Sequence, residues 1–164
     1  MAKIKNPLPM TVEWKGSNGR EFYLDNQIKK NKWSIGAEVG VRFGRTLFYL
    51  LDNNSRLQMY AIDIDISQFY SSQIKEKYGD RIIALEGNSS LVAEHILTKL
   101  DFVFIDGAHS YKAVMKDLKA YAPKVKQKCG LLGHDIDYPS IQKALKDSSI
   151  DYEVGPDNVW QQKI

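Results

Sequence analysis

The sequence predicts an α/β protein with a doubly wound sheet, mostly parallel and covered by helices on both faces. Short apolar segments alternate with amphipathic segments from residue 34 to residue 147. Such runs are typical of parallel strands buried on both faces, because each connection returns over the sheet as a helix. Right-handed crossovers then bring the ligand site to the carboxyl ends of the strands. We expect seven strands, the last of them antiparallel.

The predicted elements follow one another in a regular order after an irregular stretch at 1–19. The expected strands lie at 34–39, 57–64, 81–85, 102–105, 131–132, 152–154 and 159–163. The expected helices lie at 21–30, 46–52, 67–78, 89–98, 110–122 and 139–146. The helix at 110–122 illustrates the pattern, since Val114, Leu118 and Tyr121 recur at helical spacing.

Composition narrows the class of protein. With 164 residues, 43% of them hydrophobic and 26% charged, the chain is long enough for one domain with a real core. No apolar run reaches the roughly 18–20 residues that cross a membrane, and no signal peptide is evident. The single cysteine, Cys129, excludes an internal disulfide and fits a reducing compartment, so we expect a cytoplasmic protein. The formal charge of +3 is too small to indicate a nucleic-acid partner.

A glycine-rich turn follows the first predicted strand. The segment 35–46 reads Ile-Gly-Ala-Glu-Val-Gly-Val-Arg-Phe-Gly-Arg-Thr. Gly40 and Gly44 allow the backbone to turn sharply and to approach a ligand closely, and the next helix offers free N–H groups. Glu38 argues against a phosphate ligand and favours a cationic or hydroxyl-rich group. The dinucleotide pattern Gly-x-Gly-x-x-Gly and the phosphate-loop pattern are both absent from this segment.

This segment resembles the first motif of class I S-adenosylmethionine-dependent methyltransferases, Glu/Asp-x-Gly-x-x-x-Gly. The resemblance implies a Rossmann-like methyltransferase domain at 34–164, preceded by an N-terminal lead-in at 1–33. In that domain Glu38, Gly40 and Gly44 would hold S-adenosyl-L-methionine.

Two further loops carry groups suited to this cofactor. Asp63 ends the second predicted strand, about 20 residues beyond the glycine turn, where an acid reaches the ribose hydroxyls of an adenosine. The alternative is that Asp63 or Asp65 only caps a helix or ends a strand. In the resembling enzymes, the loop after the third strand places a polar side chain near the adenine, which carries over onto Asn88 and Ser89. For Ser89, a helix N-cap is the alternative.

The segment 102–111, Phe-Val-Phe-Ile-Asp-Gly-Ala-His-Ser-Tyr, brings a carboxylate, Asp106, to the end of a strand ahead of His109. Together with the later Gly-His-Asp at 133–135, it resembles macrocin-type sugar O-methyltransferases over about residues 34–147. A hydroxyl nucleophile needs a base or a metal, and His109 is expected to act as the general base. A surface or helix-capping histidine is the alternative.

Two acids end adjacent predicted strands. Asp106 and Asp135 would hold a divalent cation such as Mg²⁺, which prefers hard oxygen ligands and lowers the pKa of a bound hydroxyl. The resembling O-methyltransferases carry acidic metal ligands at these strand ends. The related pattern continues with a second Asp or Asn, whereas Ile136 stands here, so the third ligand is unassigned and Asp137 is a candidate.

The sequence thus predicts a methyltransferase, a transferase that O-methylates a small molecule or sugar with the aid of Asp106 and His109. The short chain leaves the acceptor pocket open, to be completed by a second copy in a homo-oligomer or by the N-terminal segment. The alternatives are a nucleic-acid methyltransferase and a non-catalytic cofactor-binding or interaction module. The first is disfavoured because the Asp/Asn-Pro-Pro-Tyr/Phe motif is absent, and we expect neither a nucleic acid nor a membrane as partner.

Overall fold

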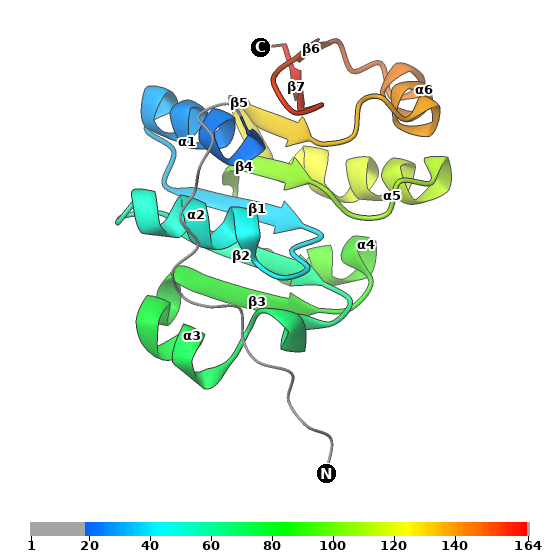
Figure 1. Ribbon diagram of the computed structural model, residues 1–164. Helices are drawn as coiled ribbons and strands as arrows, with labels where there is room; N and C mark the ends of the chain where they lie inside the picture. The colour runs from blue at the N-terminus through cyan, green and yellow to red at the C-terminus, as the bar shows by residue number, and fades with distance from the viewer. Residues whose placement is uncertain (1–18, 164) are drawn as a thin grey trace.

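The computed structural model describes residues 19–163, which form one sheet of seven strands in the order β3-β2-β1-β4-β5-β7-β6 (Figure 1). The first five strands pair in parallel, and β7 runs antiparallel to both of its neighbours. Their bounds are Ile35–Val39, Gln58–Asp63, Ile82–Glu86, Leu100–Ile105, Val125–Gly133, Tyr152–Val154 and Trp160–Gln162 for β1 to β7. The predicted fold class, with an antiparallel last strand, is confirmed.

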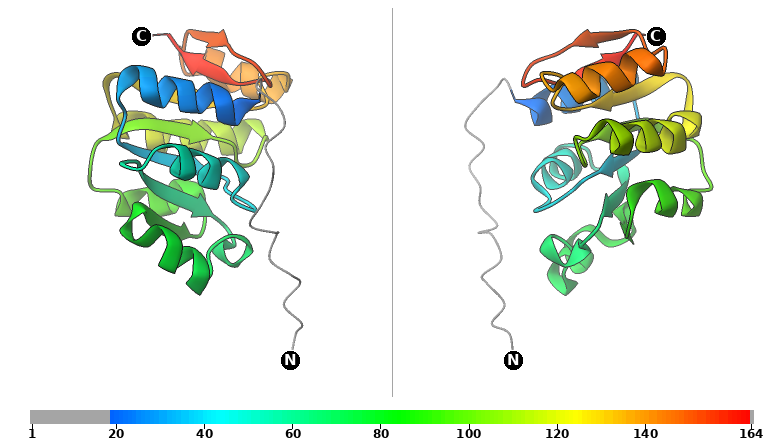
Figure 2. Two further views of the ribbon diagram at one scale, coloured as in Figure 1. Left: turned by 60° about the vertical axis from the view of Figure 1, so that its left-hand side comes forward. Right: turned by 90° about the vertical axis from the view of Figure 1, so that its right-hand side faces the viewer.

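Within residues 19–163, six α-helices cover the two faces of this sheet (Figures 1 and 2). Their bounds are Arg20–Asn31, Arg45–Asn53, Ser72–Tyr78, Ser89–Val92, Tyr111–Tyr121 and Pro139–Asp147 for α1 to α6. Helices α1 to α3 pack on one face around Leu24, Leu50 and Phe102, and α5 and α6 pack on the other around Val103, Leu118 and Leu145. Among the described residues, no helix has both the length and the apolar character needed to span a bilayer.

Two of the expected helices are shorter than predicted. The region 67–78 holds a 3-10 turn, Ile66–Gln68, followed by α3 from Ser72. Each piece has its own cap, because the Asp65 carboxylate accepts from the Ser67 N–H and the Ser71 hydroxyl accepts from the Ile74 N–H. In the region 89–98, α4 ends at Val92 and a 3-10 turn follows at Ala93–His95. In both regions the spacing of apolar residues predicts one continuous helix. The caps and 3-10 turns interrupt it, so each observed α-helix is shorter than predicted.

Helix α1, predicted within the lead-in at 1–33, belongs to the core. Leu24 and Ile28 are almost fully buried in the same cluster as Leu50 of α2. The irregular stretch predicted at 1–19 lies outside the described residues except for Gly19. The position of α1 brings its first residue, Arg20, to the end of β4, where its guanidinium contacts Asp106.

Candidate active site

The carboxyl ends of β1, β4 and β5 meet at one edge of the sheet. Val39 and Gly133 both pair with Ile105, the last residue of β4. The N–H of Asp106 donates to the Val39 carbonyl at 2.8 Å, and the N–H of His134 donates to the Ile105 carbonyl at 3.0 Å. This register sets Asp106 beside both the glycine turn and His134.

Two positions in the glycine-rich turn after β1 have backbone conformations that favour glycine. Gly40 has φ of 87°, and a Cβ on it would lie 2.3 Å from the carbonyl oxygen of Asp106. Gly44 has φ of 79° and stands at the N-cap position of α2, where a Cβ would meet the Phe48 ring. Both positions are left-handed, a region that L side chains rarely adopt. The turn after β1 can therefore pass close to the start of the loop after β4.

Glu38 lies near the end of β1, two residues before Gly40, and is only 2% exposed. Burial raises its pKa well above the ordinary value, and the nearby Asp106 carboxylate raises it further. Its Oε2 atom has no hydrogen-bond partner within the described part of the chain. Burial therefore makes Glu38 hold its proton to higher pH than an exposed glutamate does.

Asp63 ends β2 and joins two loops. Its Oδ2 atom accepts the Arg42 N–H at 2.7 Å, from the loop after β1, and its Oδ1 atom accepts the Asp65 N–H at 3.1 Å. Asp63 also contributes to the raised pKa of Glu38, so the two predicted cofactor acids lie near one another on neighbouring strands. Asp65 is a cap, since its carboxylate accepts from Ser67.

The loop after β3 presents one exposed amide. Asn88 occupies the N-cap position of α4, and its Oδ1 atom accepts the Ser90 hydroxyl at 2.8 Å. The hydroxyl of Ser89 donates to Asp117 and its carbonyl accepts the Tyr121 hydroxyl at 2.7 Å, so Ser89 ties α4 to α5. Ser89 is the first helical residue, one position after the cap.

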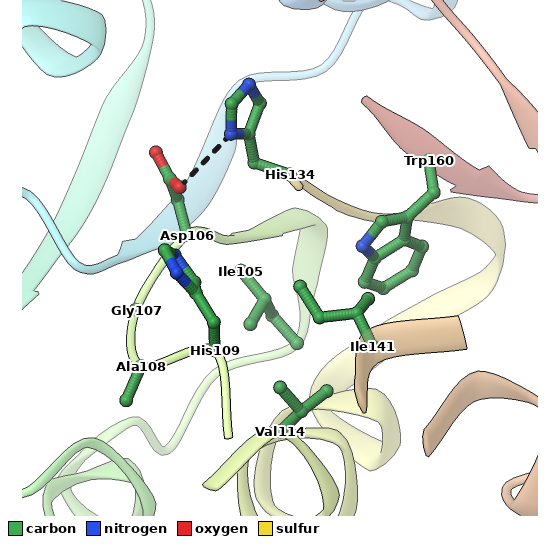
Figure 3. A pocket seen from close by; sticks show the side chains of 9 residues that line it. All are labelled: Ile105, Asp106, Gly107, Ala108, His109, Val114, His134, Ile141 and Trp160. Carbon is green, nitrogen blue, oxygen red and sulfur yellow. Dashed lines mark ion pairs between the residues drawn. The ribbon is translucent and has the colours of Figure 1, made fainter. Parts of the chain in front are cut away.

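Two carboxylates and two histidines form an acid–histidine cluster, defined here as Asp106, His109, His134 and Asp135. Nε2 of His109 lies 2.7 Å from Oδ2 of Asp135, and Nδ1 of His134 lies 2.9 Å from Oδ1 of the same residue. Both contacts are ion pairs, which form when the imidazole is protonated. Figure 3 shows Asp106 directed toward the His134 ring, with Nδ1 and Oδ1 3.6 Å apart.

Burial governs the electrostatics of Asp106. It raises the pKa of this carboxyl, although the positive charges of Arg20 and His134 lower it. Nη1 of Arg20 lies 2.8 Å from its Oδ2 atom. Asp135 adopts φ of 57°, a left-handed conformation that Asp tolerates better than most residues, and its carboxylate lies between the two histidines.

Three members of the cluster fit a divalent metal ion. Asp106, His134 and Asp135 each offer one ligand atom, and these atoms lie within 4.8 Å of one another. Both nitrogens of His134 are buried without a hydrogen-bond partner among the described residues, which leaves them available as ligand atoms. Two carboxylates with one imidazole suit a transition metal such as Mn²⁺ as well as Mg²⁺. Asp137, a candidate from the sequence, is exposed and outside this group.

A small pocket opens beside the cluster (Figure 3). Its walls are polar on one side and apolar on the other, where Val114, Ile141 and Trp160 contribute. The Tyr138 ring, 44% exposed, lies 4.9 Å from the His109 ring. An acceptor placed here would touch an apolar wall and an aromatic ring while facing the carboxylates.

A search of curated proteins finds a partial sequence match. One curated relative, a ribosomal RNA small subunit methyltransferase H from Sulfurimonas denitrificans, is 32% identical over 82 residues, 49% of this chain. The match spans only 27% of that protein's length.

Solved structures share the fold at low sequence identity. The S-adenosylhomocysteine-bound methyltransferase PaMTH1 of Podospora anserina superposes with a TM-score of 0.72 at 14% identity, over 88% of this chain and 78% of that one. CalS11, a TDP-rhamnose 3'-O-methyltransferase of calicheamicin biosynthesis, gives 0.68 at 16% identity, over 87% and 78%. MycE of the mycinamycin pathway, solved with Mg and S-adenosylhomocysteine, gives 0.63 at 18% identity, over 86% and 48%.

A family description matches most of the chain. Residues 37–136, from the first strand through the loop after β5, match the family described as a methyltransferase domain. This range contains the glycine turn, Asp63 and the whole acid–histidine cluster. The chain therefore belongs to the methyltransferase-domain family.

Proposed function

We propose that this protein transfers the methyl group of S-adenosylmethionine to a hydroxyl oxygen of a small molecule or sugar. The observation that carries the proposal is the pairing of His109 with Asp135 at the open edge of the sheet, 2.7 Å apart. An alcohol must lose its proton as it attacks, and a histidine held by a carboxylate is suited to take it. The sugar substrate named for CalS11 is consistent with such an acceptor.

The proposed cofactor site runs along the ends of β1, β2 and β3. Gly40 and Gly44 let the loop after β1 lie close to the ligand, Asp63 accepts hydrogen bonds from the ribose diol, and Asn88 lies near the adenine. Both Asp63 oxygens already accept one N–H each, and each retains a second lone-pair direction for a hydroxyl. Glu38, which is buried near the end of β1, is the other carboxyl proposed to hold the cofactor.

The proposed reaction is an in-line displacement. The acceptor oxygen bonds to the methyl carbon, the bond from carbon to sulfur breaks, and its electron pair stays on sulfur as a thioether. Because Nε2 of His109 faces Asp135, Nδ1 is the atom that takes the hydroxyl proton. Asp135 then stabilises the imidazolium, while the apolar wall of the pocket limits access of water.

Asp106, His134 and Asp135 would hold a divalent cation in this scheme. When bound, such an ion lowers the pKa of a hydroxyl and orients it. MycE was solved with Mg, which is consistent with metal assistance in this fold.

The experiment that tests the function is an acceptor screen. Purified protein is incubated with methyl-labelled S-adenosylmethionine and hydroxyl-bearing sugars, nucleotide sugars and phenols, with and without Mn²⁺ or Mg²⁺. Labelled product that depends on His109 supports the proposal. Tight cofactor binding by calorimetry with no labelled acceptor would instead favour a non-catalytic binding module.

Methylation of RNA is a second candidate function. The match to a ribosomal RNA methyltransferase favours it, although that match spans about a quarter of the relative. Exposed lysines on one face of α5 would suit a phosphate backbone; they are Lys112, Lys116 and Lys119. Small-subunit ribosomal RNA therefore belongs in the screen, and label found only in RNA would replace the small-molecule proposal. A cytoplasmic location and completion of the pocket by a second copy stay predictions.

A further inference from the structure

Arg20 connects α1 to the acid–histidine cluster. Its Nη1 atom donates to Oδ2 of Asp106 at 2.8 Å, across 86 positions of the sequence. The two side chains are only 23% and 13% exposed, so solvent screens this pair weakly. The backbone N–H of Arg20 also donates to Oδ2 of Asp157 at 3.4 Å, which fixes the start of α1 near the same site.

The guanidinium is bound to a carboxylate that a metal ion would need. Asp106 supplies one of the three ligand atoms of the metal-binding group. Its Oδ2 oxygen is bound to Arg20, while its Oδ1 oxygen is the one directed toward His134. A divalent cation near this carboxylate would lie close to a fixed positive charge and would be repelled by it. The remaining partners, His134 and Asp135, bring an imidazole ring and a carboxylate.

We propose that the Arg20 guanidinium neutralises Asp106 in the acid–histidine cluster and competes with a divalent metal ion for this carboxylate. The inference rests on the metal-binding part of the proposed function. The centre then has two states, one neutralised by the guanidinium and one by a metal ion after the Arg20 side chain has moved away. In the first state Asp106 is charge-balanced without metal, and proton transfer through His109 and Asp135 needs no cation.

Metal affinity tests this competition directly. Mn²⁺ is titrated by calorimetry into the wild-type protein, Arg20→Met and the control Lys30→Met, which removes a positive charge from the exposed last turn of the same helix. We expect the Kd of Mn²⁺ to fall at least about tenfold in Arg20→Met and to change less than about twofold in Lys30→Met. Arg20→Lys keeps the charge and should bind Mn²⁺ like the wild type. Addition of Asp106→Asn to Arg20→Met should abolish the gain.

Three results would overturn the inference: an equal Kd in wild type and Arg20→Met, an equal gain in the Lys30 control, or no Mn²⁺ binding by any variant. If Arg20→Met unfolds, as judged by circular dichroism, Arg20→Gln takes its place. Should neither fold, addition of Mn²⁺ to the wild-type protein must shift the side-chain NMR signal of Arg20, and an unmoved signal refutes competition. Methyl transfer from labelled S-adenosylmethionine, measured on the same samples without added metal, reports separately on the proposed function.

Discussion

Nε2 of His109 lies 2.7 Å from Oδ2 of Asp135, which orients a half-exposed histidine at the mouth of the pocket. The carboxylate comes from the loop after β5 and the histidine from the loop after β4, so the pair depends on the register of these two strands. A carboxylate behind an imidazole fixes the tautomer and stabilises the protonated ring.

Substitution of His109 should therefore separate binding from turnover. We expect His109→Ala to bind S-adenosylmethionine with a Kd within about threefold of wild type, and to lose roughly 10²–10⁴-fold in methyl transfer, the range of a general base. His95→Ala, an exposed histidine away from the cluster, is the matched control and should remain active. Full activity of His109→Ala in the labelled assay would remove the base assignment.

The Asp63 carboxylate should determine cofactor affinity. Hydrogen bonds to a charged group contribute about 1.5–3 kcal/mol, so we expect Asp63→Asn to raise the Kd of S-adenosylmethionine about 10- to 100-fold in calorimetry. Asp63→Ala should also lower the free energy of unfolding, because the Arg42 and Asp65 N–H groups lose their acceptor.

The control for this change is Asp65→Asn, which alters the cap of a 3-10 turn two residues away. Its Kd should stay within about threefold of wild type. Equal affinities for Asp63→Asn and the wild-type protein would place the ribose elsewhere.

Much of the fold could be predicted from the local pattern of apolar and polar residues. Apolar strands ending in acids predicted where Asp63 and Asp106 would lie, because parallel strands bring their carboxyl ends to one edge. The predicted helix boundaries near 67–78 were wrong. The Asp65 and Ser71 side chains each accept a hydrogen bond from one backbone N–H, and the spacing of apolar residues carries no information about such caps.

Two members of the site needed the three-dimensional structure. Arg20 reaches Asp106 across 86 positions, and a contact at that separation has no local signal in one sequence. His134 was visible beside Asp135, but its approach to Asp106 depends on the pairing of Ile105 with Gly133. The types of residue found at the ends of predicted strands can suggest where a site lies. Which side chains contact one another in that site depends on the strand register and on how the helices pack.

Stability should vary with pH through Glu38. Burial raises its pKa well above the ordinary value of 4.5, so the folded state holds the proton more tightly than the unfolded state. The free energy of unfolding should therefore fall by about 1.4 kcal/mol for each pH unit between about 4.5 and the folded pKa. Glu38→Gln cannot ionise, and its stability relative to wild type should increase over that window.

Urea unfolding at a series of pH values measures this difference. Glu86→Gln, at the exposed end of β3, is the control and should keep the wild-type slope. Parallel curves for Glu38→Gln and wild type would mean that Glu38 titrates normally in the folded protein.

The close approach of Gly40 to Asp106 can be separated from backbone strain by a matched pair of substitutions. Gly40→Ala and Gly79→Ala both place a side chain at positive φ, 87° and 56°, which costs about 1–3 kcal/mol in either case. Only Gly40→Ala also drives a Cβ to 2.3 Å from the Asp106 carbonyl oxygen, whereas nothing lies within 4 Å of the corresponding Cβ at Gly79. Gly40→Ala should therefore be the less stable variant in urea and should also weaken binding of S-adenosylmethionine, while Gly79→Ala keeps wild-type affinity. If the two variants lose stability equally and both bind normally, the turn after β1 tolerates a side chain and its contact with the β4 loop does not shape the cofactor site.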